Sequence, residues 1–204
     1  MSRAGARRDG RLVSGLLLFA WALAAGPATG AEVLRLEVER WEGLYRVSLD
    51  ARLAAAPETV RTMVLEPAGW RRYVPWLVRV EPLGAPRPGV RRVRTVLRGC
   101  VLFFCRDLEH VQDFTARAHG RTVVAYTVPG MGDFRRGLTR WEILPARGGG
   151  TRMRMVSELE PAFWVPPVIG PWILKLRLRE MALTVVRRMD GERAGEYRWG
   201  DEAP

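Results

Sequence analysis

Few side chains in this sequence are of the types that transfer protons or bind metals. The chain has two histidines, His110 and His119, and neither stands in a spacing typical of a catalytic triad or a zinc site. His119 precedes Gly120 and is predicted to be a turn residue, whereas His110 falls within a predicted strand, where a structural role is favoured. We therefore expect no catalytic set, no metal site and no cofactor.

Three carboxylates, Asp107, Glu109 and Asp113, occupy alternate positions of one strand-like run. Alternation places them on the same strand face. Paired acids on one face can support acid–base chemistry, but a row of carboxylates that faces solvent has the same pattern. We predict that these three side chains point to solvent.

The two cysteines, Cys100 and Cys105, favour a disulfide, because their number is even and the chain begins like an exported protein. In one extended strand they would lie about 17 Å apart, which is too far for a bond. A disulfide therefore requires residues 101–104 to form the tip of a tight loop. The alternative is a pair of buried, unpaired thiols.

Residues 1–31 have the composition of a secretory signal peptide. Four arginines precede an apolar run from Leu12 to Ala25, and small residues follow up to Ala31. The alternative is a retained anchor, but this run is shorter than the roughly 20 residues that a spanning helix needs. We expect cleavage and export, with a periplasmic location.

The net charge of +11 favours anionic partners. For an exported protein, an anionic membrane surface is a nearer partner than nucleic acid, which we do not expect to be bound. The alternative is a solvated basic surface without a partner. The sequence leaves the oligomeric state open.

Alternating apolar and polar residues predict an antiparallel sheet with two flanking helical regions. Residues 33–41 and 44–53 form an opening hairpin, and six further strand-like runs are separated by turn residues, which implies a meander. A short helix begins at Pro57, and a second runs from about Ala68 to Tyr73. A long helix spans about Pro171 to Met189, and its apolar seam must face the sheet.

This order of elements resembles the START-like, or SRPBCC, superfamily, which includes polyketide cyclases and ubiquinone-binding START proteins. The resemblance covers about Leu34 to Met189 and implies an α+β helix-grip fold, with one domain over residues 32–193 and a polar tail over 194–204. The stretches that match are Ala56-Pro57-Glu58 with Val60, Trp70, Tyr73-Val74-Pro75, Pro129–Phe134, Gly137 with Trp141, Pro145 and Gly150-Thr151.

The resemblance also implies a cavity between the sheet and the last helix that holds a lipid or another hydrophobic small molecule. Methionine and aliphatic side chains suit an adaptable apolar guest, and Ser157 could bind its polar end. The residues expected to line the cavity are Tyr126, Trp141, Met153, Met155, Ser157, Leu174, Leu178 and Met181.

Three apolar connections are expected to meet at one end of the sheet, because alternate turns of a meander share an end. They are residues 101–104, 128–134 and 163–171, and a packed satellite core there is the alternative to an opening that contacts a membrane. The residues expected to form this lid or membrane contact are Phe103, Phe104, Met131, Phe163 and Trp164.

A binding or carrier protein is therefore the leading hypothesis, and an enzyme is the less favoured one. A cyclase or dehydratase acting on an aromatic or polyketide-like substrate would need a proton-transferring side chain in the pocket. The available candidates are Tyr126, His110 and Glu158, and their sequence context singles out none of them.

Overall fold

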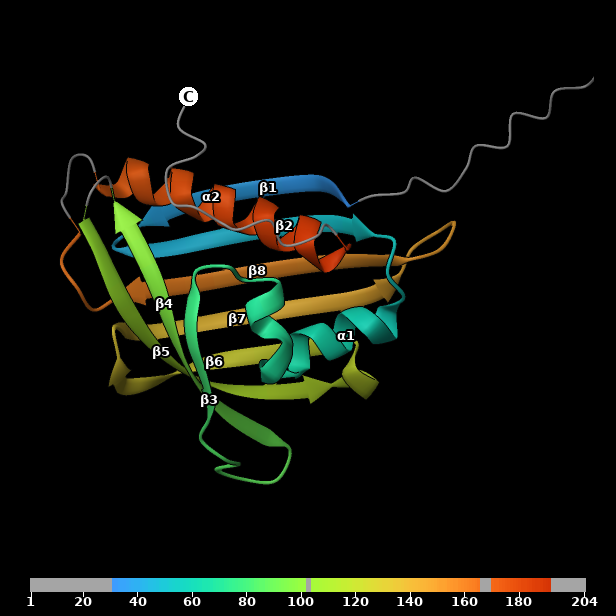
Figure 1. Ribbon diagram of the computed structural model, residues 1–204, viewed down its shortest axis with the longest axis horizontal. Coiled ribbons are helices and arrows are strands. Elements are labelled where there is room, and N and C mark those ends of the chain that lie inside the picture. Colours follow the sequence, from blue (N-terminus) through green and yellow to red (C-terminus); the bar gives the residue numbers. More distant parts are fainter. Residues whose placement is uncertain (1–30, 102–103, 166–169, 192–204) are drawn as a thin grey trace, which may run out of the picture.

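An eight-stranded antiparallel sheet organises the chain, in a computed structural model that describes residues 31–101, 104–165 and 170–191 (Figure 1). Two helices, α1 (Pro57–Leu65) and α2 (Gly170–Met189), and two short 3-10 turns, η1 (Pro67–Arg72) and η2 (Ala118–Gly120), accompany it. The strands are β1 (Glu32–Trp41), β2 (Leu44–Leu53), β3 (Leu77–Pro82), β4 (Val90–Val101), β5 (Phe104–Arg117), β6 (Thr122–Gly132), β7 (Phe134–Pro145) and β8 (Thr151–Pro161).

The strand order is β1-β2-β8-β7-β6-β5-β4-β3, and each neighbouring pair is antiparallel. Strands β3 to β8 therefore form the predicted meander, and β2 closes it by pairing with β8. Together with the long C-terminal helix, this order confirms the predicted α+β helix-grip fold.

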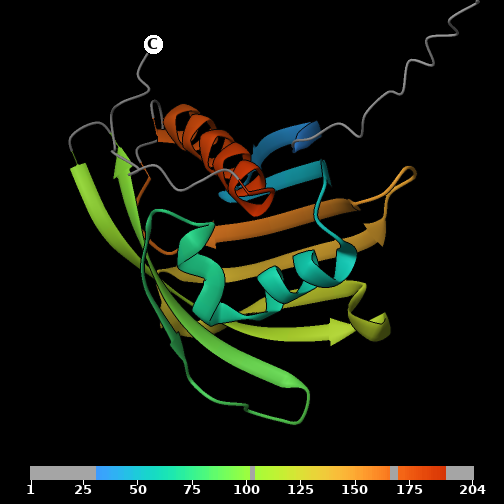
Figure 2. The ribbon, with the colours of Figure 1, turned by 45° about the vertical axis from the view of Figure 1, so that its right-hand side comes forward.

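The curved sheet has a concave face that carries the helices (Figures 1 and 2). Helix α2 crosses one part of this face and contacts β1 and β2, whereas α1 contacts β7 and β8. Apolar side chains of β2, β6, β7 and β8 alternate onto the concave face and form the core with both helices. Their burial is the main stabilising contribution to the fold.

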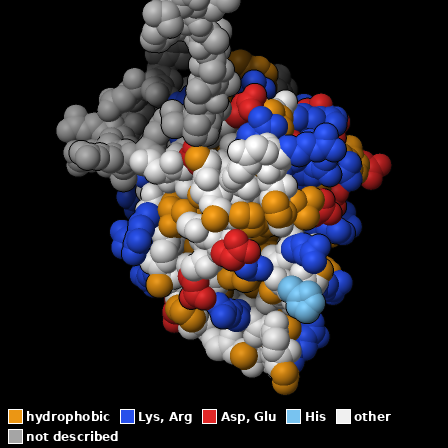
Figure 3. Space-filling model, turned by 90° about the vertical axis from the view of Figure 1, so that its right-hand side faces the viewer, with side chains coloured by type: hydrophobic (Ala, Val, Ile, Leu, Met, Phe, Trp, Pro, Cys, Tyr) orange, Lys and Arg blue, Asp and Glu red, His pale blue; other side chains and the backbone are white. Residues whose placement is uncertain are grey.

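One end of the molecule, where α2 finishes, is tightly closed. Leu53, Ile143 and Val186 are fully or almost fully buried there. A carboxylate oxygen of Asp190 accepts a hydrogen bond from the backbone N–H of Ala54 at 2.6 Å, which ties the end of α2 to the start of α1. We call this the closed end; Figure 3 shows it, with Lys and Arg side chains gathered along one edge and hydrophobic side chains across the middle.

The outer, convex face of β4 and β5 carries ion pairs. The predicted solvent-facing carboxylates pair with arginines of the neighbouring strand, so the prediction that they point away from the core is confirmed. The pairs are Arg98–Asp107, Arg94–Glu109 and Arg92–Asp113, with N–O distances of 2.9, 2.9 and 2.7 Å.

Some predicted boundaries differ from those in the structure. Strand β6 continues to Gly132 rather than ending in a turn from residue 128, because Asp133 donates its backbone N–H to the Glu109 carbonyl at 2.8 Å and extends the pairing with β5. The predicted signal peptide lies outside the described residues, apart from Ala31, which packs partly buried against the core. The tail over 194–204 also lies outside them. None of the described helices is long and apolar enough to cross a membrane.

Candidate ligand site on the concave face

On β8 and α2, packing loosens with distance from the closed end, whereas the concave face of β2 stays buried as far as Tyr45. Along β8, Thr151 and Met153 are buried, whereas Met155, Ser157 and Leu159 are only half-buried. Helix α2 shows the same trend, since Val186 and Met189 are buried but no described side chain from 172 to 185 is. Beneath the start of α2, apolar side chains of β8 and α2 are therefore only partly covered by the described residues, next to the buried side chains of β2.

The predicted lining residues divide between these two regions. Met153 belongs to the closely packed core, while Trp141 and Met155 are partly buried and pack against its margin. Ser157 is half-buried on β8. The three helix residues, Leu174, Leu178 and Met181, are half-buried on α2.

Two hydrogen-bonded pairs lie among these apolar side chains. The hydroxyls of Thr139 and Ser157 are 2.8 Å apart, across the β7–β8 pair. The Nε2 atom of His110 lies 2.8 Å from the hydroxyl oxygen of Thr127 on the neighbouring strand β6. This part of the face thus combines an apolar lining with a few hydrogen-bonding groups, which is typical of small-molecule sites.

His110 is a buried, uncharged side chain in this setting. It is 5% exposed, and burial lowers its pKa from 6.5 to about 4. Its ring lies against Phe134, with centroids 4.4 Å apart. At neutral pH the imidazole can donate one hydrogen bond and accept another, but it carries no charge.

Tyr45 is a candidate that the sequence reasoning missed. It lies on the concave face of β2 with Val47 and Leu49 and is 3% exposed. Its hydroxyl proton has no acceptor among the described residues, because the nearby Arg40 guanidinium can only donate. Burial raises the pKa of this hydroxyl, against the opposing effect of the nearby Arg40 guanidinium. The alternating pattern of β2 already placed Tyr45 on the buried face, which was the available signal.

At the end opposite the closed end, Asp133 joins the turn after β6 to β5 and to the segment that follows β8. The predicted connections 101–104 and 163–171 lie partly outside the described residues, so the meeting of all three stays a prediction. The carboxylate of Asp133 accepts hydrogen bonds from the Arg106 guanidinium at 2.7 Å and from the Glu109 backbone N–H at 2.8 Å. Its carbonyl oxygen accepts from the backbone N–H of Ala162 at 2.8 Å. Phe163 adds a ring contact with Phe134, with centroids 6.2 Å apart. We call this the Asp133 end.

The predicted lid residues are placed as follows. Met131 and Phe163 are half-buried, and Trp164 is 78% exposed. Phe103 lies outside the described residues, as does the side chain of Phe104. Trp172, at the start of α2, is also largely exposed, at 68%.

Two residues considered in the sequence analysis lie on the outer face of the sheet. Tyr126 is 44% exposed, because it alternates with the buried residues Val123 and Ala125 of β6. Glu158 forms an ion pair with Arg46 of the adjacent strand β2. Tyr126 therefore does not join the other predicted lining residues, and of the three proton-transfer candidates only His110 lies on the concave face.

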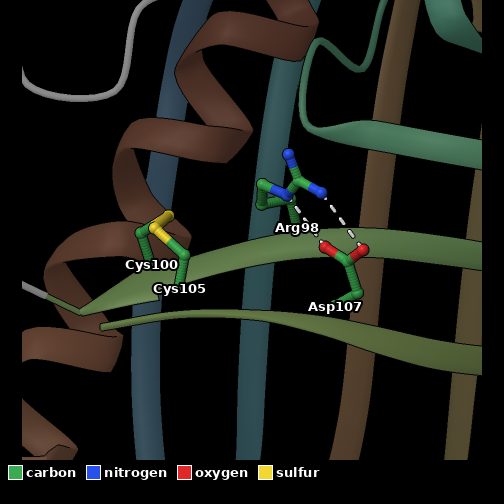
Figure 4. Close-up of a disulfide and its surroundings, with 4 residues drawn as sticks. All are labelled: Arg98, Cys100, Cys105 and Asp107. Atoms are coloured by element: carbon green, nitrogen blue, oxygen red, sulfur yellow. Dashed lines mark hydrogen bonds and ion pairs between the residues drawn. A yellow bond between two sulfur atoms is a disulfide. The ribbon is translucent and has the colours of Figure 1, made fainter. Parts of the chain in front are cut away.

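Cys100 and Cys105 form the predicted disulfide. They are paired directly across β4 and β5, beside the pairing of Val101, the last residue of β4, with Phe104, the first of β5. The ion pair between Arg98 and Asp107 follows on the same side of this hairpin (Figure 4). The disulfide thus fixes the register of the hairpin next to the start of α2.

A separate pocket of about 550 Å³ lies between α1 and η1. Its lining includes the carboxylates of Glu58 and Glu66, together with Met63, Arg72 and Tyr73. Glu58 and Glu66 are paired with Arg61 and Arg91. This pocket does not include any of the predicted lining residues.

The sequence and the fold were compared with known proteins. Residues 45–192 match the family model described as polyketide cyclase / dehydrase and lipid transport. No curated protein matches the sequence.

Three solved structures illustrate the likeness in fold. A STAR-related lipid transfer protein from Xanthomonas axonopodis is 18% identical, with a TM-score of 0.61 over 79% of this chain and 97% of that one. The Zhui aromatase/cyclase from Streptomyces sp. R1128 is 13% identical, with a TM-score of 0.59 over 72% and 92%. A START superfamily protein from Mycobacterium smegmatis is 17% identical, with a TM-score of 0.56 over 71% and 97%.

At these identities the likeness establishes the fold, and the family is established by the sequence match. Because that match spans most of the chain and the helix-grip fold agrees with it, the protein belongs to the polyketide cyclase/dehydrase and lipid transport family of the START-like superfamily.

Proposed function

We propose that this protein is an exported carrier that binds a lipid or another hydrophobic small molecule between the concave face of the sheet and α2. The observation that carries the proposal is the partial exposure of apolar side chains along β8 and α2 away from the closed end. Met155 and Trp141 on the sheet, and Leu178 on α2, are apolar but only partly buried. An apolar guest would cover them and gain about 25 cal/mol for each Å² of apolar surface removed from water.

Binding is a better-supported role than catalysis. Proton transfer to or from a substrate needs a side chain of suitable pKa within hydrogen-bond reach of it. Tyr126 and Glu158 lie on the outer face, and the pKa of His110 is lowered to about 4 by its burial. A cyclase or dehydratase role is therefore the second candidate, resting on His110 alone.

Transfer to or from a membrane is the second part of the proposal. Trp164 and Trp172 are strongly exposed near the Asp133 end, and tryptophan favours the membrane interface. Without residues 1–31 the chain has 29 basic and 21 acidic residues, and this net charge of +8 favours an anionic lipid surface. The apolar leader at residues 12–25 and the Cys100–Cys105 disulfide support export.

The binding proposal is tested by filling the space with a larger side chain. The Met155→Trp variant places an indole on the concave face, whereas the matched control Val156→Trp places one on the outer face, where Val156 is 41% exposed. Wild-type protein and the control, purified from the cell envelope, should release a hydrophobic compound on solvent extraction, identified by mass spectrometry. Met155→Trp, if folded by circular dichroism, should release several-fold less.

The same experiment can overturn the proposal. Equal recovery of the compound from both variants would place it outside the concave face. Recovery of no compound, together with no binding of an added apolar dye by wild-type protein, would contradict a carrier role.

A further inference from the structure

We infer that the concave face selects an uncharged ligand with an acceptor oxygen of the ketone or ester type, held by the hydroxyls of Tyr45, Thr139 and Ser157. This inference rests on the proposed function and adds the chemical class of the ligand. It follows from the strand register, from a count of hydroxyl protons and from the position of the charged side chains.

The register brings the hydrogen-bonding residues into one band across the sheet. Thr139 on β7 lies directly opposite Ser157 on β8. Ser157 in turn lies opposite Val47 on β2, two residues from Tyr45. Such diagonal neighbours are roughly 7 to 8 Å apart at Cα and within reach of a long aromatic side chain. Tyr45, Ser157 and Thr139 therefore border the same part of the concave face.

These three residues hold more donors than they use among themselves. A hydroxyl donates one proton, and the Thr139–Ser157 bond uses one of the two protons that this pair carries. The other remains to be donated whichever residue is the donor. The buried Tyr45 hydroxyl, whose proton has no acceptor among the described residues, supplies a second unused proton.

The neighbouring pair His110 and Thr127 extends the band, and it too has one more proton to donate than its own hydrogen bond uses. Neutral histidine and threonine have one mobile proton each, and their 2.8 Å hydrogen bond uses one of them. Because an unused buried donor is costly, a pure hydrocarbon would leave this band in an unfavourable state. A ligand oxygen that accepts hydrogen bonds removes that cost.

The charged side chains of β8 point away from the band. On β8, Arg152 and Arg154 pair with Asp50 of β2, and Glu158 pairs with Arg46, all on the outer face. A carboxylate or phosphate placed beside Ser157 would therefore be buried without a countercharge from these strands, which is strongly unfavourable. The ligand group beside Ser157 is therefore expected to be an uncharged oxygen.

Arg40 raises the opposite possibility, a ligand with an anionic head, and an experiment must distinguish it from an uncharged ligand. It lies opposite Tyr45 in the β1–β2 pairing, is exposed, and has its guanidinium carbon 5.8 Å from the centre of the Tyr45 ring. If the ligand carried an anionic head at the rim, Arg40 would bind it. A carboxylate ligand would then be preferred over its uncharged counterpart.

Three probes with the same ring system separate these cases: naphthalene, acetylnaphthalene and naphthoate. Binding to the full-length mature protein is measured by calorimetry at neutral pH. We expect acetylnaphthalene to bind about tenfold more tightly than naphthalene, as one or two hydrogen bonds allow, and naphthoate to bind most weakly. Equal affinity for naphthalene and acetylnaphthalene, or tightest binding of naphthoate, would overturn the inference.

Two variants test the named donors. Tyr45→Phe removes a hydroxyl whose proton is unused and Ser157→Ala removes one member of the pair; each should weaken acetylnaphthalene binding about threefold to tenfold without changing naphthalene binding. Their matched controls on the outer face, Tyr126→Phe and Ser48→Ala, should change neither. Unchanged acetylnaphthalene affinity in both Tyr45→Phe and Ser157→Ala would overturn the inference. If these proteins still bound naphthalene, the proposed function would stand. Failure of all three probes to bind wild-type protein would overturn both.

Discussion

The Nε2 atom of His110 lies 2.8 Å from the hydroxyl oxygen of Thr127, across the β5–β6 pair and within the concave face of the sheet. Because His110 is 5% exposed and rests against the ring of Phe134, this hydrogen bond is shielded from water. Desolvation disfavours the imidazolium form. His110 is thus neutral in the folded protein, and its protonation should appear in the pH dependence of the unfolding free energy.

The stability of the protein should fall on acidification because of His110. Its pKa is 6.5 when unfolded and about 4 when folded, so the unfolded state binds a proton first as the pH falls. The contribution is fully present above pH 6.5 and lost by about pH 4. Relative to His110→Gln, wild-type protein should lose on the order of 3 kcal/mol of unfolding free energy over this range, measured by urea titration.

The exposed histidine provides the control for this titration. His119→Asn, at a turn position that asparagine also tolerates, should follow the wild-type dependence on pH. If His110→Gln and wild-type protein lost stability in parallel, the buried imidazole would not be the group responsible.

Removal of the Asp133 carboxylate should loosen the Asp133 end. In Asp133→Ala, the half-buried N–H of Glu109 loses its acceptor, at a cost of about 2 kcal/mol of unfolding free energy. The Arg106 pair adds little, because Arg106 is largely exposed. Hydrogen exchange should speed up at the Glu109 amide.

The outer-face variant Asp107→Ala serves as the comparison, since Asp107 pairs with a half-exposed arginine. It should leave the unfolding free energy nearly unchanged. An Asp133→Ala protein as stable as Asp107→Ala, with unaltered exchange at Glu109, would show that Asp133 does not hold the connections together.

Exposed tryptophans near the Asp133 end should mediate lipid binding. The double variant Trp164→Glu and Trp172→Glu should bind vesicles containing phosphatidylglycerol about tenfold more weakly than wild-type protein, because two rings leave the interface and two negative charges are added. Leu144→Glu, on the outer face of β7, adds one negative charge elsewhere and should have a much smaller effect. Sedimentation with vesicles measures the bound fraction. If Leu144→Glu weakened vesicle binding as much as the double variant does, the change in net charge, and not the loss of the two tryptophan rings, would explain the weaker binding.

The sequence was sufficient to predict the opening hairpin, the six-strand meander and the disulfide, but not the pairing of β2 with β8. Alternation marked β2 clearly, since its apolar residues all fall on one face, and the distance limit on Cys100 and Cys105 required a hairpin tip between them. These features depend on local pattern and chain geometry, which a sequence records directly.

The candidate site was harder to predict, for physical reasons that two tyrosines illustrate. Strand β6 carries apolar residues on both faces, so alternation could not show that Tyr126 is on the outer one. For Tyr45, the buried face was evident, but the missing acceptor for its hydroxyl proton depends on distant strands. The loosened packing beneath the start of α2 likewise depends on how the helix crosses β1 and β2, which its own sequence does not specify.

The central claim, that an apolar guest lies between the sheet and α2, is tested most directly by nuclear magnetic resonance of protein labelled at the methionine methyl groups. Met155 and Met181 report on the proposed site, Met153 on the packed core beside it, and Met63 on the separate pocket between α1 and η1. On addition of acetylnaphthalene, the resonances of Met155 and Met181 should shift while that of Met63 stays in place. A shift at Met63 with none at Met155 or Met181 would contradict the account.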